Sequence, residues 1–222
     1  MSEEVIWLRP EHAAVGRPAE RSRAEITAAA IGLADREGLD AVSMRKVAAE
    51  LGTGAASLYR YVANRDDLLD LMADATAAEY ELRPPSGDPL ADLGVLGTRS
   101  LAIMRRHPWL PTLVLTRSTL GPGGADLLEH FLTVVDGLPL DATAKMEGFA
   151  LLQGFIAMYA HHEAGAEGEL MRRQTAYLAH VAGDGGHPRL AAVFAEAGDT
   201  GADRFPGLLR RVLTGLLGDI GA

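Results

Sequence analysis

The stretch Ser43–Val62, SMRKVAAELGTGAASLYRYV, decides the fold. Ser43 is a residue type that caps helix N-termini, and the apolar residues behind it recur at helical spacing until a glycine ends the pattern. A second segment, residues 55–62, follows after the tight turn Gly52-Thr53-Gly54. Two short helices joined by such a turn form a helix-turn-helix. The apolar positions of the first helix are Met44, Val47, Ala48 and Leu51.

The second of these helices carries polar side chains on the face expected to point outward. Leu58 and Val62 form its core side. An arginine on the outer face can donate two hydrogen bonds to guanine in the major groove, and hydroxyl groups there can reach bases or phosphates. The pattern therefore favours a DNA-reading helix, although helical hairpins without a DNA role share it. The outer face holds Ser57, Tyr59, Arg60 and Tyr61.

Helical periodicity continues on both sides of this pair. A first helix is expected from Ser22 to Gly38, and a fourth from Asn64 to about Leu82, where a Pro-Pro-Ser-Gly run breaks it. Beyond the break no alternating β-type run competes with the helical pattern, so the chain is expected to be all-α. The later helical segments are residues 88–106, 108–116, 122–138, 141–163, 166–182, 187–196 and 203–218.

The sequence divides into three parts. Residues 1–20 form an N-terminal arm, residues 21–66 a helix-turn-helix DNA-binding domain, and residues 67–222 a C-terminal regulatory and dimerisation domain. Two interpretations of the arm stay open, a solvated tail or an extension that reaches DNA. The second would use the arginines at its end, Arg17, Arg21 and Arg23.

Composition limits the function further. The 222 residues include no cysteine, which excludes a disulfide scaffold, a thiolate metal centre and a cysteine nucleophile. No apolar run approaches the roughly 20 residues that span a bilayer, and no signal peptide is visible, so a cytoplasmic protein without membrane contact is expected.

Charge is distributed unevenly along the chain. The net charge of −9 argues against nonspecific nucleic-acid binding by the whole molecule. Residues 17–65, however, hold eight basic and six acidic residues, against twelve and twenty-one in residues 66–222. This asymmetry indicates that only the N-terminal part meets a polyanion.

The stretch Ile26–Leu71, ITAAAIGLADREGLDAVSMRKVAAELGTGAASLYRYVANRDDLLDL, resembles the DNA-binding domain of the TetR family of bacterial transcriptional regulators. The distinctive elements are A-A-x-x-L-x-D-x-x-G-L, S-M-R-x-V-A-x-x-L-G and S-L-Y-x-Y-V followed by N-R-D-D-L-L. More loosely, RHPW at 106–109 and TRSTLGP at 116–122 resemble the all-helical regulatory domain of the tetracycline-repressor subgroup. The resemblance implies a homodimer that binds double-stranded operator DNA and holds a small effector in its C-terminal domain.

Carried over residue by residue, the resemblance assigns the DNA contacts. Arg45 matches a base-contacting position, and Arg65 matches a basic residue that reaches the phosphate backbone. Two alternatives stay open: Arg45 could pair with an acid such as Asp40, and the two tyrosines could be packing residues. The predicted DNA-binding residues are Arg45, Ser57, Tyr59, Arg60, Tyr61 and Arg65.

The C-terminal domain carries more polar and aromatic residues on its apolar helices than packing demands. Gln153 lies in a run rich in Leu, Phe, Ile and Met, where an amide is either hydrogen-bonded in the core or exposed to a cavity. An apolar pocket with a few polar groups suits a hydrophobic or aromatic effector, whereas a satisfied core amide and a packing Trp109 are the alternative. The predicted pocket residues are Met104, Trp109, Leu113, Arg117, Phe149, Gln153, Met158 and His161.

No metal or other cofactor is expected. His161 and His162 are adjacent on a helix and diverge by about 100°, so they rarely serve one ion. In relatives of the tetracycline repressor, a histidine just before the T-R-x-x-L-G region holds a magnesium–drug complex. Leu113 stands at about that place here, which argues against metal-assisted drug binding.

Two helices are candidates for an isologous four-helix dimer interface, residues 141–163 and 203–218. The dimer should place its two reading helices about 34–36 Å apart, one turn of DNA. The stripe expected in the interface is Phe149, Leu152, Ile156 and Tyr159, together with the leucine-rich face of the second helix.

The sequence therefore predicts a ligand-responsive transcriptional regulator, a repressor that binds a palindromic operator and is released by a small hydrophobic or aromatic effector. An enzyme is not expected, because no catalytic constellation is present. The alternative is an all-α small-molecule-binding protein or enzyme whose N-terminal helices are structural. A gel-shift assay discriminates between the two.

Overall fold

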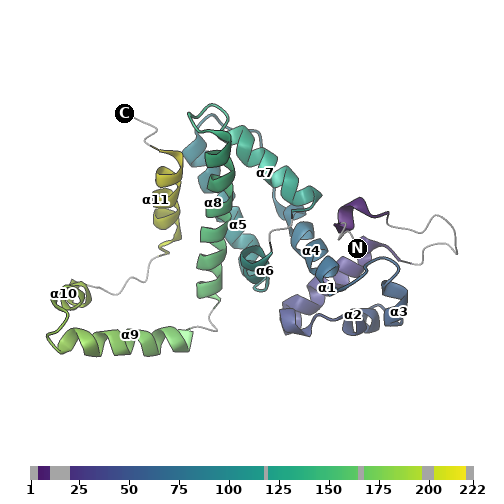
Figure 1. Cartoon of the computed structure of the whole chain (residues 1–222), viewed down its shortest axis with the longest axis horizontal. Helices are drawn as coiled ribbons and strands as arrows, with labels where there is room; N and C mark the ends of the chain where they lie inside the picture. The colour runs from purple at the N-terminus through teal and green to yellow at the C-terminus, as the bar shows by residue number, and fades with distance from the viewer. Residues whose placement is uncertain (1–4, 11–20, 118–119, 165–167, 197–202, 219–222) are drawn as a thin grey trace.

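The computed structural model describes residues 5–10, 21–117, 120–164, 168–196 and 203–218, and every regular element in these ranges is helical. Figure 1 shows an N-terminal head, a connecting helix α4, a helical bundle, and a helix pair that extends away from the bundle. The predicted all-α class is confirmed. No helix in the described ranges is both long and apolar enough to cross a bilayer.

Three helices build the head, and local sequence sets their ends. The Ser22 hydroxyl accepts a hydrogen bond from the amide of Glu25 at 3.1 Å, and Ser43 accepts one from Lys46 at 3.3 Å. The first helix stops at Gly38, whose φ of 84° favours glycine. The elements are α1 (Arg23–Glu37), the 3-10 turn η2 (Leu39–Ala41), α2 (Met44–Glu50) and α3 (Ala55–Leu58).

The second helix of the helix-turn-helix is shorter than predicted. α3 ends at Leu58, whose carbonyl accepts hydrogen bonds from the amides of both Tyr61 and Val62. Residues 59–61 therefore form a turn that continues the helical path, so Tyr61, three residues after Leu58, lies on the same inward side. Tyr61 is only 6% exposed, so its predicted place on the outer face is corrected.

The connecting helix also ends earlier than predicted. α4 (Arg65–Ala75) begins at Asn64, whose side chain accepts from the amide of Asp67 at 2.8 Å, as its residue type indicates. It passes into a 3-10 turn, η3 (Thr76–Glu79), and Tyr80 is already extended, so the regular helix to Leu82 is not observed. The Thr76 hydroxyl donates to the carbonyl of Ala73, one turn earlier in the chain.

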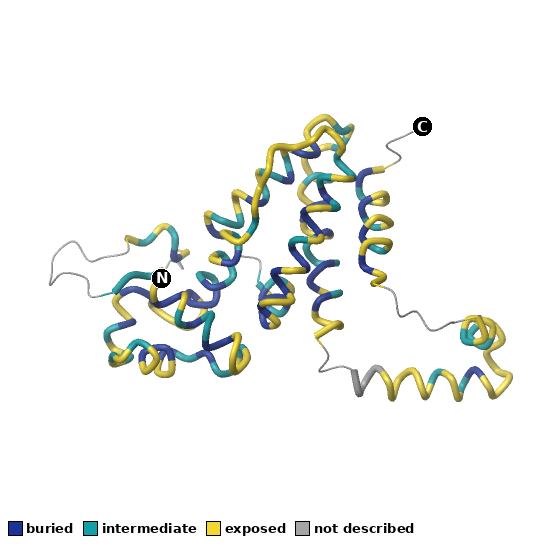
Figure 2. Tube along the Cα trace, turned by 180° about the vertical axis from the view of Figure 1, so that it is seen from behind, coloured by how far each residue is buried: buried dark blue, intermediate teal, exposed yellow. Residues whose placement is uncertain are grey.

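Five helices form the bundle, with α8 packed against α5, α6 and α11. Buried and exposed residues alternate along the bundle helices, as Figure 2 shows. Phe131 of α7 meets Phe149 of α8 edge to face, with ring centres 5.5 Å apart. The bundle helices are α5 (Pro89–Arg106), α6 (Leu110–Thr116), α7 (Pro122–Val134), α8 (Ala142–Glu163) and α11 (Phe205–Leu217).

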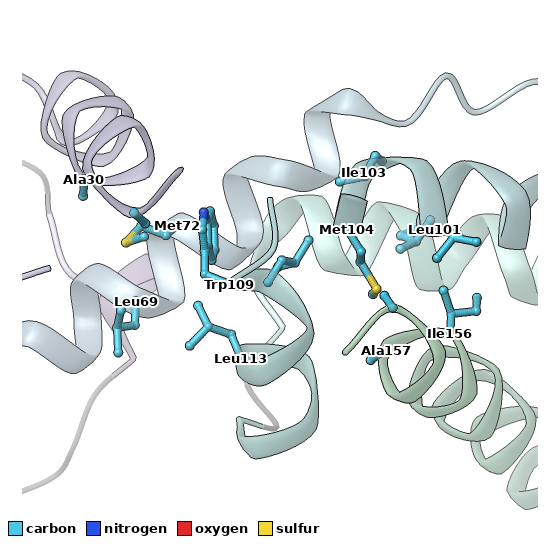
Figure 3. Packing of buried hydrophobic residues seen from close by; sticks show 14 of the residues in the cluster. Ala30, Leu69, Met72, Leu101, Ile103, Met104, Trp109, Leu113, Ile156 and Ala157 are labelled. Atoms are coloured by element: carbon cyan, nitrogen blue, oxygen red, sulfur yellow. The ribbon is translucent and has the colours of Figure 1, made fainter. Parts of the chain in front are cut away.

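Apolar packing is continuous from the head into the bundle. Figure 3 shows Met72 of α4 between Ala30 of α1 and Trp109, with Leu113 of α6 close by. Met72 is fully buried, and Trp109 is 4% exposed. α4 therefore belongs to both cores, so a change of its position affects both.

The predicted dimer stripe on α8 is corrected. Phe149, Leu152 and Ile156 are buried inside the protomer, and the ring centre of Tyr159 lies 4.9 Å from that of Phe205 on α11. Because these side chains fill the bundle, they do not form a free face. The exposed apolar side chains of α8 include Met146, Leu151 and Met158.

A further helix pair, α9 (Gly168–Gly183) and α10 (Pro188–Glu196), extends from the bundle in both whole-chain views. α9 packs mainly against α10. Tyr177 and Val193 are exposed on this pair, at 60% and 63%.

Part of the N-terminal arm is folded. Residues Ile6–Leu8 form a 3-10 turn, η1, and Ile6 is 1% exposed, so neither a solvated tail nor a DNA-reaching arm describes them. Arg21 donates to the carbonyl of Leu51 at 2.8 Å. Arg23 likewise binds carbonyl groups within the protein, whereas Arg17 lies outside the described residues.

Candidate DNA-binding face and effector cavity

Four of the six predicted DNA-binding residues lie on or beside the exposed surface of the helix-turn-helix. Arg45 and Arg60 are exposed, and Tyr59 is 53% exposed. Ser57 is half-buried, and its hydroxyl donates to the carbonyl of Gly54 at 2.8 Å. No ion pair joins Arg45 to Asp40, although both are described. These side chains provide the cationic and hydroxyl groups that DNA reading requires.

The other two predicted DNA-binding residues also make contacts within the head, although Arg65 is exposed and only Tyr61 is buried. The Arg65 guanidinium donates from Nε to the carbonyl of Val42 at 2.8 Å and from Nη2 to that of Leu39 at 3.1 Å. Tyr61 is buried, and the Arg60 guanidinium carbon lies 5.9 Å from the centre of its ring. Tyr61 therefore supports the reading face from the core, while Arg65 is bonded to the backbone of the head and remains at its surface.

A cavity of about 490 Å³ lies between α4, α6, α7 and α8. Its lining is mainly apolar, with polar groups from α4, from Tyr80 and from α8. A cavity of this size and composition is typical of small-molecule sites. Five of the eight predicted pocket residues line it, namely Met104, Leu113, Arg117, Phe149 and Gln153.

Three predicted pocket residues do not line the cavity. Trp109 is buried at the junction with the head, where its Nε1 donates to Asp35 at 2.6 Å. Met158 is 48% exposed, because five residues along α8 rotate it about 140° away from Gln153. His161 is also exposed, about 12 Å further along the helix than Gln153.

Gln153 and Tyr80 both line the cavity. The Tyr80 hydroxyl donates to the Ser100 hydroxyl at 2.9 Å. Burial raises the pKa of Tyr80, and its interactions with Ser100 and Gln153 oppose that shift only in part. Tyr80 therefore stays a neutral phenol in the cavity wall at physiological pH. Gln153 therefore lies in the cavity wall, in line with the second of the two interpretations offered for it.

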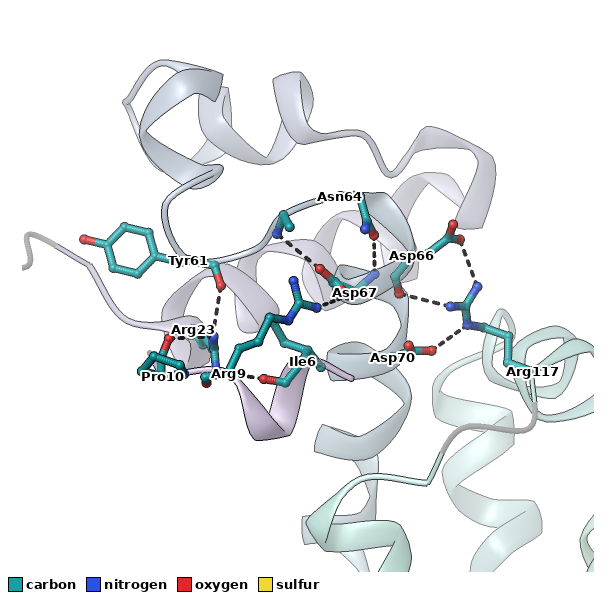
Figure 4. A network of polar contacts seen from close by, with 11 residues as sticks. Ile6, Arg9, Pro10, Arg23, Tyr61, Asn64, Asp66, Asp67, Asp70 and Arg117 are labelled. Carbon is teal, nitrogen blue, oxygen red and sulfur yellow. Dashed lines mark hydrogen bonds and ion pairs between the residues drawn. The ribbon is translucent and has the colours of Figure 1, made fainter. Parts of the chain in front are cut away.

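Arg117 joins the cavity to the start of α4, as Figure 4 shows. Its Nε donates to Asp70 at 2.7 Å, while Nη1 and Nη2 donate to the carboxylate and the carbonyl of Asp66 at 3.0 and 3.2 Å. The hydrogen bond to Asp70 is the main reason that the pKa of Arg117 is raised, so the charge is held. The Arg117 side chain is 22% exposed, and that of Asp70 is 13% exposed.

The sequence analysis missed the α4 side of the cavity. Asp70, Asp74 and Thr76 line it, and Asp74 accepts hydrogen bonds from the amides of Gly123 and Gly124 at the start of α7. Their spacing of four residues placed Asp70 and Asp74 on one face of the connector, beside its apolar stripe. That pattern was the available signal, but the pocket residues were predicted on the C-terminal helices alone.

A second polar network joins the head to the bundle. The two ring nitrogens of His107 lie 2.8 Å from Asp35 of α1 and 2.8 Å from Glu79 of η3. Trp109 donates to the same Asp35 oxygen, and Arg106 forms an ion pair with Glu79. Burial opposes ionisation of Glu79, but hydrogen bonds from Arg106 and His107 outweigh it and lower the pKa of this carboxyl below 4.5.

Two family profiles match this chain. The profile described as bacterial regulatory proteins, tetR family, matches residues 26–72, and that of the tetracyclin repressor-like C-terminal domain matches residues 83–219. The chain is 34% identical to the HTH-type transcriptional repressor DrrR1 of Streptomyces coeruleorubidus, over 96% of this chain and 83% of that protein. It is 37% identical to an HTH-type transcriptional regulator of Saccharopolyspora erythraea over 53% of this chain and 50% of that one.

Solved structures of ActR from Streptomyces coelicolor have the same fold. Apo ActR superposes with a TM-score of 0.77 at 30% identity, covering 92% of this chain and all of ActR. ActR in complex with actinorhodin gives a TM-score of 0.79 with the same coverage and identity. The complex with (S)-DNPA gives 0.75, at 30% identity, over 91% of this chain and all of ActR.

Proposed function

This chain belongs to the TetR family of bacterial transcriptional regulators, and from that membership we propose that it is a homodimeric repressor of a palindromic operator, released by a small aromatic effector. One observation carries the proposal: α4 begins directly behind the reading helix and also forms a wall of the bundle cavity. A ligand that moves this wall therefore moves the reading head.

Operator reading falls to the exposed residues of the helix-turn-helix. Arg60 and Arg45 make the base contacts, and Tyr59 and Ser57 add contacts to phosphates or base edges. Arg65 keeps one guanidinium nitrogen, Nη1, for a phosphate contact, while its other two hold the head together. Tyr61 supports the turn after α3, so its predicted contact with DNA is indirect.

The effector has an apolar, planar body and at least one oxygen acceptor. Leu113 and Phe149 offer apolar surface, while the Gln153 amide and the Arg117 guanidinium offer donors to an oxygen on the ligand. The ActR neighbours were solved with actinorhodin and with (S)-DNPA, which supports an aromatic class. Actinorhodin is therefore the first compound to try as a probe.

Release follows from differential binding. A ligand lowers operator affinity only if it binds the non-operator arrangement of the two heads more tightly. Arg117 is the connection available for this, because it lines the cavity and holds Asp66 and Asp70 of α4. A ligand that shifts Arg117 also shifts the first turns of α4.

The homodimer uses the outward faces of α8 and α11. On α8, Leu151 and Met158 are 58% and 48% exposed. On α11 a half-buried apolar stripe recurs every four residues, while the residue after each of its members, Leu209, Leu213 or Leu217, is buried in the bundle. Two such helices from each subunit form a four-helix interface. The stripe on α11 is Leu208, Val212 and Leu216.

The test is operator binding with and without ligand. Duplexes from around the protein's own gene are titrated against the wild type and against Arg60→Ala, and actinorhodin is then added. We expect sequence-specific binding that Arg60→Ala loses and a ligand reverses. Equal loss of specific and nonspecific binding in Arg60→Ala would argue against base reading. Absence of any specific complex would favour the alternative, a helical binding protein or enzyme with structural N-terminal helices.

A further inference from the structure

We propose that residues Val5–Pro10 form a clasp that positions the DNA-reading head on the effector-binding bundle. Arg9 is its attachment to the head, and Trp7 is its attachment to the bundle. The clasp is a further connection between the two parts, in addition to α4 and to the contacts of Asp35 on α1 with His107 and Trp109. Its expected effect on operator spacing rests on the proposed DNA-binding function, whereas its attachments do not.

The head attachment centres on Asp67, which is 8% exposed. One oxygen of this carboxylate forms an ion pair with Arg9, and the other accepts a hydrogen bond from the amide of Ala63 at 3.2 Å. Ala63 lies in the short link between the turn at residues 59–61, which we call the recognition turn, and α4. Arg9 therefore holds the carboxylate that fixes this link.

Arg23 of α1 fixes the backbone of the clasp to the head, as Figure 4 shows. Its Nη1 donates to the carbonyls of Ile6 and Arg9 at 3.2 and 2.9 Å, and Nη2 donates to that of Pro10 at 3.1 Å. Its Nε donates to the carbonyl of Tyr61 at 3.0 Å, directly behind the recognition turn. One guanidinium thus joins the clasp to the chain that presents Tyr59 and Arg60.

The bundle attachment is a close contact between Trp7 and Gly121. A Cβ at residue 121 would overlap Cε2 and Cζ2 of the Trp7 ring and the Asp74 carboxyl carbon, so glycine makes this approach possible. Gly121 precedes α7 as its N-cap, and both Gly121 and Asp74 line the effector cavity. The indole therefore lies against the part of the bundle where α7 meets the cavity.

The two attachments hold the head in a defined orientation. A head joined through α4 and the Asp35 contacts can still tilt about that junction, whereas an additional attachment beside α4 restricts the tilt. The separation of two operator half-sites reports how the two heads of a dimer are placed. A loosened clasp should therefore lower the selectivity for half-site spacing, and not only the affinity.

The first measurement needs neither DNA nor ligand. Amide hydrogen exchange is compared for the wild type, Trp7→Ala, Arg9→Gln and Leu8→Ala, where Leu8 is 69% exposed in the same turn and is the matched control. Both clasp variants should speed exchange at residues 63–68 and at residues 121–124, and Leu8→Ala should not. Unchanged exchange in both clasp variants would overturn the clasp.

The second measurement uses duplexes selected from random DNA by the wild type, with the selected half-site spacing and with one base pair more or less. Trp7→Ala and Arg9→Gln should lose about threefold or more of the discrimination between spacings, because the head is less restricted. Arg9→Lys, which retains a cation for Asp67, should restore part of it. An equal loss of affinity at every spacing would assign the segment a merely structural role and overturn the positioning claim.

The two measurements separate this inference from the proposed function. A wild type that selects no duplex would refute operator binding and, with it, the spacing effect. The exchange comparison would then still decide whether Val5–Pro10 joins the head to the bundle.

Discussion

The head and the bundle are built from the same kind of helix, but their cores differ. In the head, Ile26, Val47 and Leu58 are completely buried, whereas the bundle contains a cavity of about 490 Å³ beside Phe149 and Gln153. A filled core has one arrangement and moves as a unit, and a hollow one can be completed by a ligand. Operator reading thus depends on the fixed geometry of the filled core, while the effector response depends on the cavity that a ligand can fill.

The junction between these regions differs from both. Its centre is apolar, through Met72 and Leu113, but its edges are ionic. Arg117 joins Asp66 and Asp70 on one side of α4, and His107 lies between Asp35 and Glu79 where α1 meets the bundle. Ion pairs at a partly exposed edge rearrange at lower cost than a close-packed core. The junction is therefore the place where a signal from the cavity can act.

The largest expected effect comes from hollowing the filled core. Leu58→Ala should lower the free energy of unfolding by about 2–5 kcal/mol and abolish operator binding, because Leu58 is fully buried and ends α3. Chemical denaturation measures the first effect. Leu82→Ala, at a site 38% exposed, is the control. Equal costs for the two variants would contradict the contrast between the cores.

The reverse change, filling the hollow core, should leave operator binding intact. Gln153→Trp places a large ring in the cavity and should weaken ligand binding by about a hundredfold, or nearly 3 kcal/mol. Operator affinity should change by about twofold at most, since the head is untouched. Met158→Trp on the exposed side of α8 is the matched control. Calorimetry with actinorhodin checks the first effect, and loss of operator binding in Gln153→Trp would disagree with this account.

Variants of two arginines in the head distinguish a residue that reads DNA bases from one that stabilises the head. Arg60→Ala should lose about 1–3 kcal/mol of discrimination between operator and unrelated DNA while keeping its melting temperature. Arg65→Ala should lower the melting temperature, because the carbonyls of Leu39 and Val42 lose a donor, and should weaken binding to both DNAs alike through the lost phosphate contact. Binding to the two DNAs and thermal melting are measured for both variants. Identical profiles for the two variants would refute the distinction.

The smallest expected effect is a pH dependence at the junction. The pKa of Glu79 is lowered in the folded protein, so this carboxylate contributes stability above about pH 4.5 that is lost as the pH falls through its folded value. The difference in melting temperature between wild type and Glu79→Gln should therefore shrink from about pH 6 to about pH 3. A difference that is constant over this range would mean that the contact with His107 and Arg106 contributes little.

The sequence predicted the head better than the cavity for a physical reason. The start and stop of each helix in the head depend on local residues such as Ser43, Asn64 and Gly38, which act within one turn. The predicted outward direction of Tyr61 was wrong although the spacing held the signal, because Tyr61 follows the core residue Leu58 by three positions and such residues share a helix face.

In the bundle, composition identified Gln153 and Arg117 but could not assign Trp109 or Met158. Trp109 binds Asp35, 74 residues away in the chain, and no local pattern indicates such a pairing. Whether Met158 faces the cavity depends on how α8 is rotated about its axis relative to its neighbours, which local sequence does not determine. The folded N-terminal turn was not predicted for a different reason. A 3-10 turn of three residues is too short to show a periodic pattern.

The central claim is that the cavity and the reading head are coupled through α4. The most direct test is the affinity for a cavity ligand, actinorhodin or a hit from thermal-shift screening, with and without saturating operator DNA. Linkage requires operator to weaken ligand binding by the same factor by which ligand weakens operator binding. We predict this equality in the wild type and a smaller factor in Arg117→Gln. A ligand affinity that does not change when operator is added would contradict the account.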